Sequence, residues 1–336
     1  MTMSKYYNKN ELLSFNKLFN FVTGARGIGK TYQFKTWAIN DFIRTGSTCW
    51  WIMRYATEID SIVKDGRFFA DVIDRYPDHV FRIDGNVGYI AEGHDTKGAD
   101  WKPFITFKAL SESAIKAISD PACNKIVYDE FIPLPGIRYL KNEVERFLEL
   151  YFTISRGRDL RAFFLANNVT SASPYYTYLK IKPSQNEFTI QGDICIQNAR
   201  TEAFKQSMRD TRFGRLVAGT HYADYAIENE SFADSEAFVM PMPQHHNLIF
   251  TIKTEYGLFN GYMCSPACLY LKKTNDQSKY VFVFDSALHD DKTLLDFRGK
   301  YVIDIIRSYY SKGLVGFSSV TEKAEFFNSA SKYLKV

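Results

Sequence analysis

A run of eight residues near the amino end of the chain carries its clearest chemistry. It fits the pattern G-x-x-x-x-G-K-[ST], in which glycines let backbone N–H groups surround a triphosphate at the start of a helix. The lysine of this pattern reaches the β and γ phosphates, and the final hydroxyl holds Mg²⁺. The sequence therefore predicts a site for ATP and Mg²⁺ at Gly24, Ala25, Arg26, Gly27, Ile28, Gly29, Lys30 and Thr31.

The segments on either side of this loop fit the same interpretation. The apolar run 18–22 predicts a buried strand, and residues 32–43 carry apolar side chains at helical spacing. Strand, glycine turn and helix together are the geometry that phosphate binding needs. The alternative is a glycine-rich turn that binds nothing, and the flanking pattern weighs against it.

A second apolar strand, residues 125–131, contains two adjacent acids, Asp129 and Glu130. An aspartate at such a strand end supports Mg²⁺, and a following glutamate can deprotonate the attacking water. Alone, two acids more often cap a strand, so the interpretation depends on the glycine loop. A further strand near 104–110 lies between the two motifs in sequence. We therefore expect the branch of ATPases that has an inserted strand and a catalytic glutamate.

Four other polar residues are candidates for the same site. Asn167 follows the apolar strand 162–166 and could sense the γ-phosphate, or simply form a turn. Arg156 and Arg158 follow a predicted helix and could stabilise phosphoryl charge in a neighbouring subunit, with Arg156 favoured. Their alternatives are a solvated basic loop or a DNA contact. Arg54 ends the strand 48–53 and could gate Glu130, touch nucleotide, or form a surface ion pair.

Composition narrows the class of protein. The chain has 336 residues and a net charge of +4, so it is no polybasic coat, and nucleic-acid contacts would come from local patches. Its five cysteines, without a signal peptide, favour free thiols in a reducing compartment. Cys264 and Cys268 could be half of a metal site, but no matching pair exists. No apolar run reaches the roughly 20 residues that span a bilayer, so we expect no membrane partner.

The order of elements predicts an α/β fold. Apolar strands separated by helices indicate a mostly parallel sheet covered on both faces. We expect an ATPase domain over residues 1–206, a short helical linker over 207–235 that includes a glycine-broken connector at 211–216, and a small α+β domain over 236–336. The expected elements are strands at 48–53, 81–90 (a hairpin turning at Asp84-Gly85), 247–253, 261–272 and 280–285, and helices at 59–73, 139–155, 201–208, 301–312 and 322–333.

With these residues in hand, the chain resembles the DNA-packaging ATPases of phi29-like tailed phages. The matching segments reach beyond generic ATPase motifs, run from the start to about residue 240, and include 7–8, 20–30, 54–55, 77–79, 128–131, 142–144, 174–175 and 211–216. The resemblance implies a homomeric ring, with five copies the expected number, on the portal vertex of a procapsid in the host cytoplasm. Such a ring drives double-stranded DNA inward by hydrolysing ATP.

The resemblance also implies roles for particular residues. Lys30 and Thr31 bind Mg-ATP, Asp129 supports the metal, Glu130 is the catalytic base and Arg156 acts in trans. Lys116 matches a lysine that faces DNA. The chain departs from the family at Ala56, where a basic residue is expected, and in the loop after Arg158, which is one residue shorter.

For the carboxyl-terminal domain, the resemblance implies a fold similar to RNase H-like terminase nucleases. Active nucleases of that class need several carboxylates around two metals. Only Asp285, on a strand, stands out as a ligand here, so we expect no nuclease activity. The resemblance further implies docking on a structural packaging RNA, with a merely solvated surface as the alternative for the basic residues Lys272, Lys273, Lys279 and Arg298.

Two other functions stay open at this point. One is another P-loop enzyme, such as a nucleotide kinase; the Asp129-Glu130 pair and the lack of an arginine-rich lid argue against it. The other is a non-catalytic docking subunit of the packaging vertex, against which the intact Lys30, Thr31 and Glu130 argue.

Overall fold

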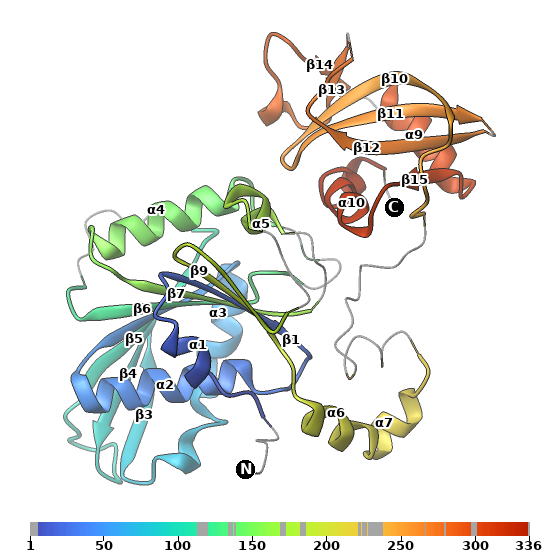
Figure 1. The fold of residues 1–336 in the computed structure, drawn as a ribbon. Helices are drawn as coiled ribbons and strands as arrows, with labels where there is room; N and C mark the ends of the chain where they lie inside the picture. Colours follow the sequence, from blue (N-terminus) through green and yellow to red (C-terminus); the bar gives the residue numbers. More distant parts are fainter. Residues whose placement is uncertain are drawn as a thin grey trace. The chain divides into compact units, whose positions relative to one another are not determined.

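The computed structural model describes two compact units. They comprise residues 1–169 with 182–232, and residues 170–181 with 233–336. The residues described are 6–112, 120–133, 137, 139–168, 173–181, 186–220, 223, 227, 238–265, 267–278, 280–296 and 301–334. Figure 1 shows each unit as a sheet with helices against it. Within these ranges no helix combines the length and apolar character that a membrane span requires.

The first unit is built on a nine-stranded sheet of order β3-β4-β5-β2-β6-β7-β1-β9-β8. Six neighbouring strands of this order run parallel to one another, namely β5, β2, β6, β7, β1 and β9. The β3–β4 hairpin and β8 add antiparallel strands at the two edges. The strands are β1 (Phe19–Gly24), β2 (Thr48–Met53), β3 (His79–Asp84), β4 (Val87–Glu92), β5 (Lys102–Ala109), β6 (Cys123–Asp129), β7 (Arg161–Asn167), β8 (Phe188–Gln191) and β9 (Ile194–Ala199).

Helices of this unit cover both faces of the sheet, as the buried parallel strands require. Adjacent side chains of β7 point to opposite faces of the sheet and contact different helices. The Phe163 ring packs 5.1 Å from Phe34 of α2, whereas the Phe164 ring packs 4.6 Å from Phe147 of α4. The helical elements are α1 (Asn10–Ser14), α2 (Lys30–Thr45), α3 (Ala56–Val63), η1 (Lys64–Phe69), η2 (Ile73–Arg75), α4 (Glu143–Ser155), α6 (Glu202–Arg209) and α7 (Arg212–Val217).

The expected mostly parallel α/β fold is confirmed, with a correction to the role of one strand. The strand inserted between β1 and β6 is β7, whereas β5 (the predicted 104–110 strand) lies on the far side of β2. Sequence order misled here because parallel strands joined by crossovers need not be neighbours in the sheet.

Two further local predictions were wrong, and one was confirmed. The helix expected from 139 begins at Glu143, because Asn142 has a left-handed φ of 54°. Residues 211–216 are not a bare connector: Thr211 accepts a hydrogen bond from the Gly214 N–H and caps α7. The hairpin predicted from Asp84-Gly85 is confirmed; its two turn residues are Gly85 and Asn86, and Gly85 has a positive φ of 54°.

The second unit is a smaller α+β structure with a six-stranded sheet of order β14-β13-β10-β11-β12-β15. The strand predicted over 261–272 is in fact two antiparallel strands, paired at Cys264 and Cys268. Its elements are β10 (His245–Thr254), β11 (Gly257–Ser265), β12 (Cys268–Thr274), β13 (Val281–Val283), η3 (Ser286–Leu288), β14 (Leu294–Leu295), α9 (Val302–Ser311), β15 (Val315–Phe317) and α10 (Val320–Leu334), with α5 (Pro174–Tyr178) grouped here by its contacts.

A buried ion pair joins α2 to β6 in the first unit. Lys125 Nζ lies 2.7 Å from a carboxylate oxygen of Asp41, and the two side chains are 0% and 6% exposed. Asn124 donates to the same carboxylate at 3.0 Å. Burial alone would raise the pKa of Asp41, but the bonds from Lys125 and Asn124 outweigh it and lower the pKa from 3.8 to about 2. The ionised pair therefore stabilises the folded state.

We expect Asp41→Asn to destabilise the protein by about 3 kcal/mol at pH 7, since it leaves the Lys125 ammonium buried without its counter-charge. Because the folded pKa is the lower one, the stabilisation is complete above about pH 4 and lost as pH falls toward 2. Urea unfolding of both proteins from pH 7 to pH 3 should show the difference shrinking. Asp304→Asn, in the exposed Asp304–Arg307 pair, is the control and should change stability by less than about 1 kcal/mol. A difference that grows with acidity would contradict this account.

Candidate functional site

The glycine-rich loop connects the interior strand β1, between β7 and β9, to the first turn of α2. Gly27 and Gly29 have φ values of 81° and 94°, a left-handed region that favours glycine. Gly24 is needed for a different reason, because a Cβ there would lie 2.8 Å from the carbonyl oxygen of Ala199. The loop therefore has the tight backbone path that presents N–H groups at a helix start.

Lys30 points back into this loop. Its ammonium donates to the carbonyl oxygens of Gly24 and Ala25, both at 2.9 Å, and to Asn167 Oδ1 at 3.3 Å. Burial lowers the pKa of Lys30 to about 7, although the charges of Asp129 and Glu130 act in the opposite direction. A phosphate anion beside the ammonium would favour the charged form, so the site is electrostatically suited to an anionic ligand.

Asn167 reaches the lysine because of strand register. β7 lies beside β1, and Asn167 is the direct partner of Gly24. Its side chain therefore stands at the loop, at the carboxyl end of the sheet. The sequence placed Asn167 at a strand tip, and the register brings it to within hydrogen-bond distance of Lys30.

Asp129 and Glu130 lie at the same edge, one strand beyond β7. Thr31 Oγ1 donates to Asp129 Oδ1 at 3.4 Å. Burial, and then the charge of Glu130, raise the pKa of Asp129 to about 6. Burial, followed by Glu58, also raises the pKa of Glu130. Both acids therefore take up protons more readily than free carboxyl groups, and a cation beside them would oppose this shift.

This donor set fits Mg²⁺ that also binds substrate phosphates. Mg²⁺ prefers oxygen ligands and usually keeps waters beside one or two protein groups. Thr31 supplies a hydroxyl and Asp129 a carboxylate. Among the residues that the structure describes, no group of three His, Cys, Asp or Glu side chains forms a closed metal cage. The five cysteines are free, buried thiols.

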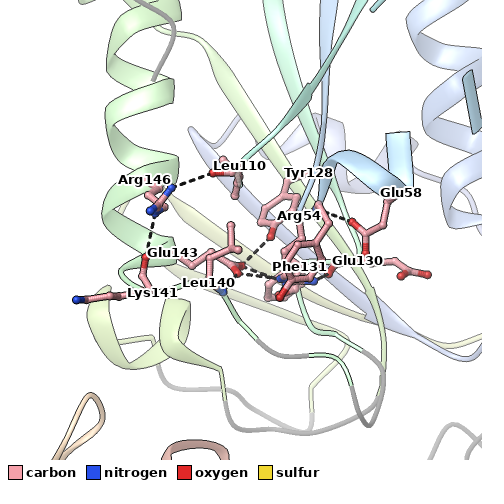
Figure 2. Close-up of polar contacts among 11 residues, drawn as sticks. Arg54, Glu58, Leu110, Tyr128, Glu130, Phe131, Leu140, Lys141, Glu143 and Arg146 are labelled. Atoms are coloured by element: carbon pink, nitrogen blue, oxygen red, sulfur yellow. Dashed lines mark hydrogen bonds and ion pairs between the residues drawn. The ribbon is translucent and has the colours of Figure 1, made fainter. Parts of the chain in front are cut away.

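Arg54 has a position that the sequence did not predict. It is 1% exposed, so it is no surface ion pair, and its Nε and Nη2 donate to the two carboxylate oxygens of Glu143 at 2.8 and 3.1 Å. Figure 2 shows the guanidinium between Glu143 and the end of β6, where it donates to the carbonyl oxygens of Glu130 and Phe131 at 2.9 and 2.8 Å. Arg54 therefore acts on Glu130 through its backbone.

Glu143 completes this cluster from the first turn of α4. It also accepts hydrogen bonds from the Tyr128 hydroxyl at 2.7 Å and the Leu140 N–H at 2.8 Å. Sequence reasoning missed Glu143 as a functional residue, although the segment 142–144 was among the family-like matches. Glu130 itself has a left-handed φ of 55°, an uncommon backbone state that these contacts hold in place.

The two arginines after α4 differ in what they contact. The Arg158 guanidinium donates five hydrogen bonds to main-chain carbonyl groups, of residues Ser155, Pro121, Cys123, Asp120 and Ile154. Arg156 is exposed, and within the described residues its side chain has no hydrogen bond or ion pair. This difference favours Arg156 over Arg158 for a contact outside the chain.

Arg156 also lies at the opposite edge of the sheet from the glycine loop. It directly follows α4, whose first residue contacts Arg54 near the Glu130 end of β6, and it precedes the first residue of β7. A 13-residue helix is about 20 Å long. The Arg156 side chain is therefore out of reach of its own loop. Lys116, predicted to contact DNA, lies outside the described residues, as do Lys279 and Arg298.

Taken together, the parallel sheet, the loop after its interior strand β1 and the acids two strands away define a packaging-type ATPase fold. The structure is similar to the N-terminal domain of the DNA packaging ATPase from bacteriophage phi29, with a TM-score of 0.51 and 30% identity over 60% of this chain and 100% of that one. The family description Podovirus DNA encapsidation protein (Gp16) matches residues 1–330, and the chain belongs to this family.

Comparisons over most or all of the chain agree. The chain is 29% identical over 332 residues to the DNA packaging protein of Bacillus phage phi29, covering 95% of each. It is 32% identical over 245 residues to the corresponding protein of Bacillus phage B103, covering 72% of this chain and 73% of that protein. A chain of the bacteriophage phi29 viral genome packaging motor assembly matches 96% of this chain and 98% of its own length, with 27% identity and a TM-score of 0.71.

The Arg54–Glu143 pair provides a test of the site's framework. Arg54→Ala should lower the free energy of unfolding by about 3–5 kcal/mol, because the Glu143 carboxylate stays buried without its partner. Arg54→Lys should recover only part of this, since an ammonium cannot bind both carboxylate oxygens side by side.

Urea unfolding followed by circular dichroism measures this effect. Lys102→Ala is the matched control, because Lys102 and its partner Asp100 are 64% and 88% exposed and contribute less than about 1 kcal/mol. A loss for Arg54→Ala no larger than that of the control would show that the pair does not hold the site together.

Proposed function

We propose that this protein is an ATP-hydrolysing motor that moves double-stranded viral DNA into a procapsid as a homomeric ring, with five copies the proposed number. The observation that carries the proposal is the placement of polar groups on the sheet. Lys30, Thr31, Asp129 and Asn167 meet at one edge, while Arg156, which bonds to no other described residue through its side chain, lies at the other. That arrangement suits a ring in which each site is completed by the next subunit.

The proposed chemistry assigns one task to each residue. Lys30 and the loop N–H groups bind the β and γ phosphates of ATP, and Thr31 and Asp129 hold Mg²⁺, which neutralises phosphate charge. Glu130 takes the proton of the attacking water, and the raised pKa of this carboxyl makes it a better base. Asn167, bonded to Lys30, senses whether the γ-phosphate is present. Arg156 of one subunit stabilises the transferring phosphoryl group in its neighbour.

We propose three parts with the boundaries 1–206, 207–235 and 236–336, the last similar to RNase H-like terminase nucleases but without nuclease activity. The order β12-β11-β10-β13-β14, with an antiparallel meander followed by parallel strands, supports this fold. Lys253, on β10, forms an ion pair with Asp290 at 2.6 Å. An ammonium group therefore lies beside this carboxylate, where a nuclease of this class would hold a metal ion. The partners are DNA, the portal vertex of the procapsid in the host cell, and a structural RNA, for which the exposed Lys272 is a candidate contact.

The first test of the proposal is steady-state ATP hydrolysis with and without double-stranded DNA under conditions where the ring assembles. DNA should stimulate turnover in the wild type, and Glu130→Gln should lower it by about 100-fold or more, because the general base is lost. DNA-independent turnover, or none, would contradict the motor and point to another P-loop enzyme or a docking subunit.

The second test addresses the arginine between subunits. Arg156→Ala alone should lower turnover by about 1,000-fold. A 1:1 mixture with Glu130→Gln should recover part of the activity, since each mixed interface can combine an intact Glu130 with an intact Arg156. Arg158→Ala mixed in the same way should recover nothing beyond the sum of the parts, because Arg158 bonds only within its own chain. Absence of any recovery with Arg156→Ala would exclude action in trans.

A further inference from the structure

The sheet order determines in which direction a bound nucleotide extends. The proposed catalytic base Glu130 directly follows β6, Asn167 ends β7, and the glycine loop follows β1. A γ-phosphate placed by these groups lies on the β6–β7 side of the loop. The α-phosphate and the nucleoside therefore leave on the other side, toward β9 and the helix α6 that follows it.

The amino-terminal segment lies against the loop and is firmly attached to it. The Tyr7 N–H donates to the carbonyl oxygen of Ile28 at 2.9 Å, and the Tyr7 hydroxyl donates to Gln197 Oε1 of β9 at 3.0 Å. Tyr7 is 3% exposed, and its ring stacks at 6.4 Å on Phe34 of α2. The backbone next to Tyr7 is therefore held in a defined place beside the loop.

This attachment places an exposed aromatic ring next to the phosphate loop. Tyr6 is 49% exposed, and its Cβ and Cδ1 atoms lie 3.9 Å from where a side chain on Gly29 would begin. The ring centroid lies 6.0 Å from that of Phe204 on α6, which is 5% exposed. Phe204 in turn lies 3.3 Å from where a side chain on Gly27 would begin. Two aromatic rings thus flank the loop.

We propose that Tyr6 is the base-stacking residue of a nucleobase subsite, in which its ring stacks on the planar base of the nucleotide and Phe204 supports it from behind. The inference rests on the proposed function, because it needs a triphosphate in the glycine loop. An aromatic ring offers a π-face to any base, and such stacking contributes roughly a factor of 10 or more in affinity. The subsite takes a heteroaromatic base and makes no contact with the phosphates.

Equilibrium binding of Mg-ATP and of inorganic Mg-tripolyphosphate separates the base from the phosphates. Tyr6→Ala should raise the Kd for ATP about 10-fold and leave the Kd for tripolyphosphate unchanged, whereas Tyr6→Phe should bind both as the wild type does. Phe213→Ala is the matched control, because Phe213 is also 49% exposed but lies on α7. Unchanged tripolyphosphate binding shows that the variant is folded.

An unchanged Kd for ATP in Tyr6→Ala would overturn the subsite, and so would an equal loss for ATP and tripolyphosphate. In either case the proposed function would stand if the wild type binds tripolyphosphate and Lys30→Ala does not. A wild type that binds neither ligand would overturn the proposed function together with the subsite.

Discussion

The buried pair between Arg54 and Glu143 is the interaction on which the candidate site depends most. A guanidinium this deeply buried is stable only when its N–H groups and its charge are matched, and here one carboxylate and two carbonyl groups do so. The same contacts join the ends of β2 and β6 to the start of α4. The backbone of Glu130 is therefore set by a side chain from the end of another strand.

The parallel sheet holds the glycine loop and the acids at one edge and Arg156 at the opposite edge. Because all six parallel strands end at one edge, the glycine loop, Asn167 and the acid pair gather there. α4 returns the chain to the opposite edge and leaves Arg156 there, exposed, while Arg158 closes the helix end on main-chain carbonyl groups. A single chain thus cannot bring Arg156 to the groups that we propose form the hydrolytic site. That separation is the structural reason for proposing a ring.

The segment after β9 packs against the glycine loop and restricts it. Gly24 and Gly27 are packed against Ala199 and Phe204, so the loop has no freedom on that side. Tyr6 and Tyr7 cover the loop's outer part. The surroundings of the glycine loop are therefore built from the beginning of the chain and from a helix nearly two hundred residues later, which only the folded sheet brings together.

The sequence by itself determined the local parts of this protein. The spacing of Gly24, Gly29, Lys30 and Thr31 and the apolar runs around them were enough to predict the loop, its strand and its helix, because these depend on neighbours in the chain. The acids at 129–130 and Asn167 could likewise be placed at strand ends. Strand order could not be read in this way, and so β5 was given the place that β7 occupies. Only the tertiary structure decided that Arg54 is buried against Glu143, that Arg158 is occupied and Arg156 is not, and that Tyr6 stands beside the loop. Each of these depends on contacts between residues far apart in sequence, whose energies come from burial and pairing that no local pattern records.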